Sequence, residues 1–188
     1  ATTEIYTLSL HDALPILYGA FRRSFPRVDV AHLQADAERW RHYAEIYGIL
    51  LDPTLETDGE IARSIRHVNI FGRAAYPLVM SAYSEHARGL IPREQLIETL
   101  EWIQAMYLRR TLVGLPNERL IARLCRARLE GRDALARAVA RITPSDERVS
   151  AVLKYSELPH PAYVLGRVEG VDDTSEHDVE HIVPTVPS

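Results

Sequence analysis

Hydrophobic residues recur with the period of an α-helix over most of the chain. The clearest case is residues 31–51, where apolar side chains are spaced four, three, four, three and four positions apart. This spacing places them along one side of a helix, so we expect that side to face the core. Asp52 and Pro53 follow and predict the end of the helix. The stripe consists of Leu33, Ala37, Trp40, Ala44, Tyr47 and Leu51.

A second helix is predicted to begin at Thr57 and Glu60, whose spacing is typical of a capping box. It would bury Ile61, Ile65 and Val68 on one face. Glycine and proline residues separate the segments that follow. Further helices are expected at residues 74–87, 93–113, 117–129, 132–142, 144–156 and 162–169.

Three local signals refine these helices. Pro77 would lie in the first turn of its helix, where its missing N–H costs little. Thr143 would cap the helix that starts at Pro144, with Asp146 in the first turn. The long helix at 93–113 should bury one side. That side carries Leu96, Leu100, Ile103 and Tyr107.

The pattern changes near the end of the chain. From Asp178 to Ile182 polar and apolar residues alternate, and Pro184 follows shortly after. A period of two predicts a short strand that ends at the proline. Residues 170–176 form a polar linker before it. We therefore expect an all-α, multi-helix domain at 17–169, followed at 177–188 by the first strand of a second module.

Residues 1–16 have a different origin from the rest. Back-translated with one choice of codons, they match a common synthetic sequencing adapter codon for codon. We interpret them as translated adapter and exclude them from the prediction of the fold. The native part is expected to start near Leu17 and to be truncated at both ends.

Composition narrows the class of protein. With 46% hydrophobic residues the chain is globular, and no apolar run is long enough for a membrane span, so no membrane partner is expected. Cys125 is the single cysteine, which excludes an internal disulfide and suits a reducing bacterial cytoplasm. Its neighbours at helical spacing are apolar, which favours a core position for Cys125 over a nucleophile.

The positive charge is concentrated in one region. The net charge is −4, but residues 109–141 contain nine Arg against Glu118, Glu130 and Asp133. This local excess is compatible with a surface that faces phosphate groups. Solvated helix faces in an arginine-rich protein explain the same count, and the sequence leaves both interpretations open.

Glu180 and His181 are the strongest candidates for chemistry. A carboxylate beside a histidine can hold a divalent cation while the imidazole takes a proton from water, which suits phosphodiester hydrolysis. The segment Glu180-His181-Ile182-Val183-Pro184 resembles the first motif of the HNH (His-Me finger) nucleases, most closely that of the GmrSD-type restriction endonucleases. The resemblance implies that His181 is the catalytic general base, that Glu180 binds a metal such as Mg²⁺, and that the parent protein cuts DNA in phage defence.

The helical part carries further elements of this resemblance, in the family's order. They are Tyr107-Leu108-Arg109-Arg110 with Leu112-Val113-Gly114 and Asn117, then Thr143-Pro144-Ser145-Asp146, and Tyr163-Val164-Leu165-Gly166-Arg167-Val168-Glu169. Thr185 departs from the family's usual glutamine. Arg109 and Arg110 are candidates for contacts with DNA phosphates, but neighbouring helical side chains point about 100° apart, so the two need not serve one role. Burial or salt bridging between helices is at least as strong an alternative.

The resemblance also implies missing parts. In HNH nucleases a second strand and an Asn-bearing helix follow the motif and complete the metal site. An N-terminal ParB-like domain, associated with nucleotide-dependent activity, precedes the helical region in this family. We therefore expect an active parent enzyme and a fragment that is inactive alone.

Two other functions compete with the nuclease. His177 and His181 with Glu180 match the inverted zincin motif H-x-x-E-H, which requires a helix where the pattern favours a strand. A non-catalytic helical interaction or scaffold domain is the other alternative.

Overall fold

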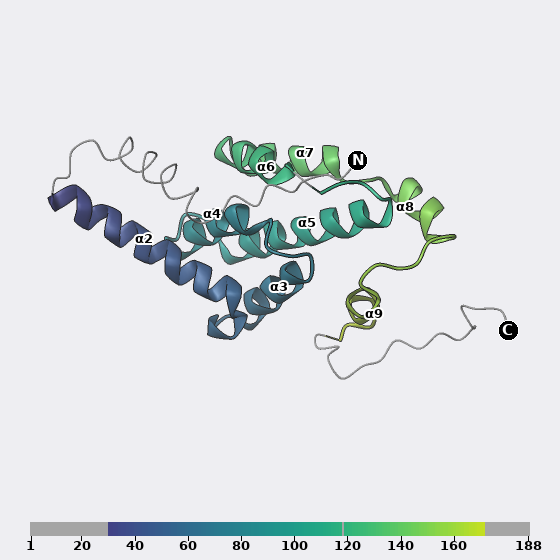
Figure 1. Ribbon diagram of the computed structural model, residues 1–188, viewed down its shortest axis with the longest axis horizontal. Helices are drawn as coiled ribbons and strands as arrows, with labels where there is room; N and C mark the ends of the chain where they lie inside the picture. The colour runs from purple at the N-terminus through teal and green to yellow at the C-terminus, as the bar shows by residue number, and fades with distance from the viewer. Residues whose placement is uncertain (1–29, 118, 172–188) are drawn as a thin grey trace, which may run out of the picture. The chain divides into compact units, whose positions relative to one another are not determined.

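The computed structural model describes residues 30–117 and 119–171, and all regular secondary structure in them is helical (Figure 1). The all-α class is therefore confirmed for this part of the chain. Two compact units are divided after His42, inside the first described helix, and the second unit holds the remaining described elements. The expected strand and most of the linker lie outside the described residues.

The helices begin and end close to the predicted positions, and the one predicted at 132–142 agrees to the residue. Within the described residues none is both long and apolar enough to cross a bilayer. The elements are α2 (Val30–Leu51), η1 (Pro53–Leu55), α3 (Gly59–Ile70), α4 (Tyr76–Ala87), α5 (Arg93–Leu112), α6 (Leu120–Leu129), α7 (Arg132–Ile142), α8 (Asp146–Leu153) and α9 (Pro161–Glu169).

Helix α5 is the centre of the second unit, because α3, α4, α7 and α8 all contact it. Its predicted inner side is confirmed: Leu96, Leu100, Ile103 and Tyr107 are buried. Residues of α3 and α4 complete the same core. Burial of this many large apolar side chains is the main stabilising contribution to the fold.

The face that α2 buries differs from the predicted stripe. Trp40, Tyr47 and Leu51 are 52%, 40% and 44% exposed, whereas Ile46 and Leu50 are buried. The expectation that the stripe faces the core is therefore wrong, although the helix itself is confirmed. The reason is tertiary: the Leu50 carbonyl oxygen accepts hydrogen bonds from the Tyr76 hydroxyl and the Asn69 amide, at 2.9 and 2.8 Å, which turns this face inward.

Two predicted caps are also wrong. Asp58, not Thr57, caps α3, since its carboxylate accepts from the N–H groups of Glu60 and Ile61 at 3.0 and 3.1 Å. Ser145 is the cap residue of α8, so Pro144 precedes the helix. The Thr143 hydroxyl bonds instead to the Val139 carbonyl oxygen in the last turn of α7, at 2.8 Å.

Cys125 and Pro77 behave as predicted. Cys125 is half-buried against the core, and burial raises the pKa of its thiol. A raised pKa keeps the thiol protonated at neutral pH, which disfavours a nucleophilic role. Pro77 lies in the first turn of α4.

Candidate functional site

The two residues expected to carry catalysis, His181 and Glu180, lie outside the described residues. Their roles as general base and metal ligand stay predictions. In the described part of the chain, no three His, Cys, Asp or Glu side chains are grouped so that they could hold a metal ion.

Helix α9, which precedes the candidate motif in sequence, is fastened to the core by Tyr163. The Tyr163 hydroxyl donates to Oε1 of Gln104 at 3.0 Å, and its ring meets those of Phe71 and His67 edge-on, with centroids 5.5 and 5.1 Å apart. The buried Gln104 amide in turn donates to the carbonyl oxygen of Ser64 at 3.3 Å. Helices α3, α5 and α9 are thus joined by a continuous series of hydrogen bonds.

The end of α9 is closed by Gly170, whose φ of +74° is the left-handed conformation common at helix ends. A cavity of about 420 Å³ lies between α5 and α9, with the Glu101–Arg167 ion pair (3.6 Å) on its wall. Burial raises the pKa of the Tyr163 phenol in this wall, so the phenol stays a hydrogen-bond donor at neutral pH. This arrangement positions α9 and contains no nucleophile paired with a base.

Arg110 is buried and holds together three separate segments. Its Nη1 donates to the Ile142 carbonyl oxygen at 2.7 Å, its Nη2 to that of Pro116 at 2.5 Å, and its Nε to Oδ1 of Asn117 at 3.1 Å. The fixed fork of a guanidinium suits such a junction, because several donors leave it in one plane. Arg110 therefore fastens the end of α7 and the turn after α5.

Arg109 lies on the neighbouring face of α5 and bonds to the start of α8. Its Nη1 donates to the Pro144 carbonyl oxygen at 3.0 Å, and its Nη2 lies 2.6 Å from Oδ1 of Asp146. Of the two alternatives left open for Arg109 and Arg110, the contacts favour bridging between helices. A role of either residue in DNA binding stays a prediction, and for the buried Arg110 it is disfavoured.

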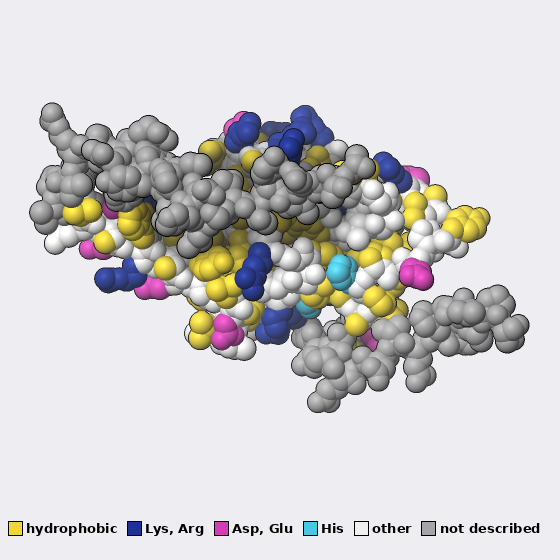
Figure 2. Space-filling view, viewed as in Figure 1, with side chains coloured by type: hydrophobic (Ala, Val, Ile, Leu, Met, Phe, Trp, Pro, Cys, Tyr) yellow, Lys and Arg dark blue, Asp and Glu magenta, His cyan; other side chains and the backbone are white. Residues whose placement is uncertain are grey.

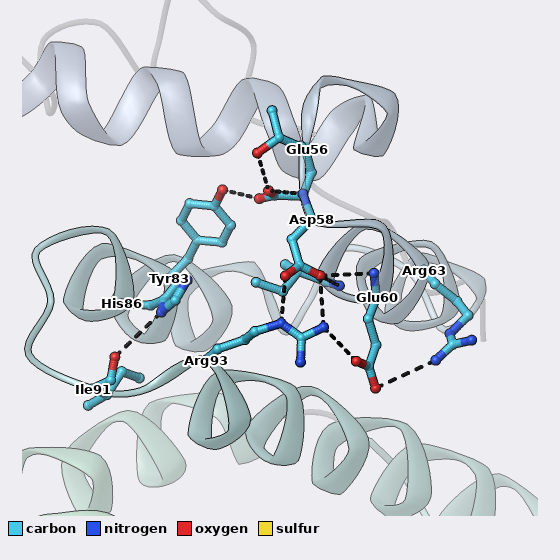
Figure 3. A network of polar contacts seen from close by, with 10 residues as sticks. Glu56, Asp58, Glu60, Arg63, Tyr83, His86, Ile91 and Arg93 are labelled. Carbon is cyan, nitrogen blue, oxygen red and sulfur yellow. Dashed lines mark hydrogen bonds and ion pairs between the residues drawn. The ribbon is translucent and has the colours of Figure 1, made fainter.

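Acidic side chains gather at the start of α3, as Figure 3 shows. Asp58 and Glu60 both bind Arg93, with Nε–Oδ2 and Nη2–Oε2 distances of 2.5 Å. Glu56 accepts from the N–H of Asp58 at 2.8 Å and from the Tyr83 hydroxyl. Each carboxylate therefore has donors within the protein, and the cluster needs no cation to balance it.

The electrostatics of this cluster follow from the same contacts. The Arg93 guanidinium, together with the N–H groups at the start of α3, holds the pKa of Asp58 well below its usual range. Burial and the nearby Glu56 carboxylate raise the pKa of Tyr83. Asp58 is thus charged and Tyr83 neutral at physiological pH, as a permanent structural contact requires. We assign this network to the fold and not to catalysis.

The excess of arginine at residues 109–141 is visible in the sequence, but the sequence does not separate the arginines that stabilise the fold from those that remain exposed. Arg110 and Arg128 are buried, and Arg128 forms an ion pair with Glu85 at 2.6 Å. Arg132 binds Glu98 at 2.6 Å and lies over the Trp102 ring. The exposed remainder on α6 and α7 could be found only once the buried positions of each helix were known.

Comparison with known proteins gives no relative. No protein-family model matches the chain, and no curated protein or solved structure matches it. Function is therefore inferred from the residues themselves and from the geometry of the described helices.

Proposed function

We propose that the chain is the helical region and the start of the HNH module of a GmrSD-like DNA endonuclease, which acts in phage defence. The observation that carries the proposal is the segment Glu180-His181-Ile182-Val183-Pro184, which follows a helical domain and a short linker in the sequence. Tyr107, Asp146 and Tyr163, from the three upstream segments of the resemblance, all lie in helices. The reaction is hydrolysis of a phosphodiester bond in DNA with a divalent metal, Mg²⁺.

The proposed roles follow from side-chain chemistry. The Glu180 carboxylate is a hard oxygen ligand of the kind that Mg²⁺ prefers, and the metal supplies stabilisation of negative charge on the phosphate. The neutral His181 imidazole takes the proton of the attacking water. The remaining metal ligands and the residue that orients His181 belong to a second strand and helix, which we place downstream in the parent protein. The ParB-like domain is placed upstream.

The test is to sequence the source locus past Ser188 and express the extended protein. Cleavage of DNA should require Mg²⁺ and stop when a chelator is added. His181→Ala should lower the rate by about 10²–10⁴-fold, the usual contribution of a general base. His177→Ala is the matched control, because it removes a nearby histidine outside the motif and should leave the rate unchanged.

Two outcomes would contradict the nuclease. Equal cleavage by the His181→Ala protein would show that the motif is not catalytic. Zinc-dependent hydrolysis of a peptide substrate that is lost in both the His177→Ala and the His181→Ala proteins would support the inverted zincin instead. A downstream frame without an Asn-bearing helix would exclude catalysis by this module.

A non-catalytic interaction domain is the second candidate, favoured by the exposed stripe on α2. The four-three spacing of Leu33, Trp40 and Tyr47 with intervening alanines is that of a coiled coil, which fits a second copy of the same helix. In a parallel pair Asp36 of one copy would lie beside Arg41 of the other, with opposite charge. Trp40→Glu should then convert a dimer to a monomer in sedimentation, and a wild-type monomer would exclude this candidate.

A further inference from the structure

Arginine side chains line a groove of about 410 Å³ between α6 and α7. We call it the arginine groove. Apart from the arginines, the described residues that line the groove are alanines and one acidic residue, Glu130. The lining residues are Arg123, Arg126, Ala127 and Glu130 from the α6 side, and Ala134, Arg137, Ala138 and Arg141 from α7.

Helical geometry explains why these residues meet. Both sets follow the spacing i, i+3, i+4 and i+7, which is one face of a helix. Gly131 joins the two helices with a φ of +110°, which non-glycine residues rarely adopt, and this turn brings the two faces together. Leu124, Leu135 and Val139 lie on the other sides of α6 and α7 and are buried in the core. Burial of one face of each helix therefore fixes the arginine face outward.

The charge of the groove is not neutralised by the protein. Four guanidinium groups face one carboxylate, a net charge of +3, and all four arginines are exposed. None of the four side chains forms an ion pair or hydrogen bond with another described residue, in contrast to those of Arg109, Arg110, Arg128 and Arg132. Dark blue side chains gather over α6 and α7 in Figure 2. In a chain of net charge −4, this is a local positive potential.

We propose that the arginine groove binds the phosphodiester backbone of double-stranded DNA. The inference rests on the proposed function for its choice of nucleic acid. Guanidinium groups bind phosphate oxygens in pairs of parallel hydrogen bonds, which makes arginine the preferred partner of a phosphate backbone. The small Ala127, Ala134 and Ala138 side chains between the arginines let a bulky backbone approach.

The lining also indicates which form of DNA the groove binds and by which part. None of the described residues lining the groove is aromatic, so it offers no platform on which an unpaired base could stack. Arginines on each helix are three or four residues apart, a rise of about 4.5–6 Å, so each helix can meet neighbouring phosphates of one strand. The groove therefore holds a duplex by its backbone, without reading its sequence.

Binding by phosphate contacts has a characteristic dependence on salt. Each neutralised phosphate releases counterions. The logarithm of the association constant should therefore fall linearly with the logarithm of the salt concentration, with a slope of about −0.9 per contact, or about −3 to −4 for four arginines. The dissociation constant at physiological salt should lie at about 10⁻⁴–10⁻⁶ M, as for other sequence-independent binding. The readout is the fluorescence anisotropy of a short labelled duplex, titrated with the full chain without divalent metal.

The variant that tests the groove replaces Arg123, Arg126, Arg137 and Arg141 with Gln. We expect binding at low salt to weaken by at least about 10-fold and the salt slope to approach zero. The matched control replaces four exposed arginines elsewhere in the chain, so its net charge changes by the same amount. It should bind as the wild type does, because its arginine groove is intact. Those four are Arg41, Arg66, Arg88 and Arg148. Circular dichroism and thermal unfolding check that both variants fold.

Several outcomes would overturn the inference. Equal loss of binding in both variants would mean that net charge alone is responsible, and retention of binding in the groove variant would place the DNA elsewhere. Tighter binding of an RNA duplex, a single strand or an acidic peptide would assign the groove to that partner. A failed nuclease is distinguishable from a failed groove: the extended protein would then not cut DNA, while the chain would still bind it with the predicted slope.

Discussion

Arg93 at the start of α5 binds the Asp58 carboxylate, which also caps α3. Its Nε and Nη2 lie 2.5 and 3.1 Å from Oδ2 and Oδ1 of Asp58. Oδ1 of Asp58 also accepts from two backbone N–H groups of α3. One side chain therefore fixes the beginnings of two core helices relative to each other, although the two residues are 35 positions apart.

Removing the Asp58 carboxylate should destabilise the fold. Asp58→Ala loses the cap and is expected to lower the free energy of unfolding by about 0.5–2 kcal/mol. Asp58→Asn keeps a capping oxygen but loses the negative charge that binds Arg93, so its loss should be smaller. Urea denaturation measures both, and an equal loss in the two variants would mean that Arg93, not the cap, matters. Thr57→Ala is the control and should have little effect, because Thr57 does not cap α3.

The contribution of Asp58 should also depend on pH in one direction. Its folded-state pKa is lowered below the ordinary value of 3.8, chiefly by the hydrogen bond from Arg93. A depressed acid pKa stabilises the fold fully above the unfolded-state pKa and loses this effect as pH falls toward the folded-state value. The difference in unfolding free energy between wild type and Asp58→Asn should be constant above about pH 5 and shrink below about pH 4. A difference that grew on acidification would contradict the assignment.

Replacing Arg110 should destabilise the fold much more than replacing Arg109. Arg110→Gln removes a buried guanidinium together with its hydrogen bonds to the carbonyl oxygens of Pro116 and Ile142, and we expect a loss of about 2–3 kcal/mol. Arg109→Gln breaks an ion pair whose partner Asp146 is 81% exposed, so the loss should stay below about 1 kcal/mol. Thermal unfolding measures both. A DNA affinity that falls in Arg109→Gln without a change in stability would support the contact with DNA after all.

Tyr163 should control the local stability of α9. Tyr163→Phe removes the donor to the buried Gln104, at a cost of about 1 kcal/mol. Hydrogen exchange should accelerate in the amides of α9 and stay unchanged in α5, because the core does not depend on this bond. Tyr155→Phe is the matched control, since Tyr155 is 90% exposed. Uniform acceleration across all helices would show that Tyr163 acts on the whole fold.

Two glycines should respond oppositely to alanine. Gly131→Ala forces an alanine into a φ of +110° and should destabilise by about 1–3 kcal/mol. Gly48→Ala lies within α2, where an added Cβ meets no atom within 4 Å, and should stabilise by about 0.5–1 kcal/mol. Because Gly131 sets the turn between α6 and α7, its replacement should also weaken DNA binding by the arginine groove. Denaturation and anisotropy together test this pair.

The helices were predictable because their apolar period is local. Leu96, Leu100 and Ile103 lie on one face wherever a helix forms, and a large apolar face must find a core. The buried face of α2 was not predictable in this way. Its apolar residues cover more than one face, and the contacts of Leu50 with Tyr76 and Asn69 decided which face turned inward.

The candidate functional residues also fall into a local group, visible in the sequence, and a group that depends on packing. Glu180 and His181 were recognised because their motif is a run of neighbouring residues, and their roles stay predictions. The arginine groove was visible only as an excess of charge, since Arg123 and Arg141 are far apart in sequence. Packing of Arg110 into the core and of Arg109 against α8 removed both from the candidates that the charge count favoured.

The sequence by itself determined the helices, their approximate ends and the position of the candidate motif, because these depend on residues within a few positions of one another. Tertiary structure alone decided which face of α2 turns inward, which arginines are buried and which remain free for a ligand. Those choices depend on which distant groups meet, because most buried donors and acceptors of a folded protein have a partner at short range.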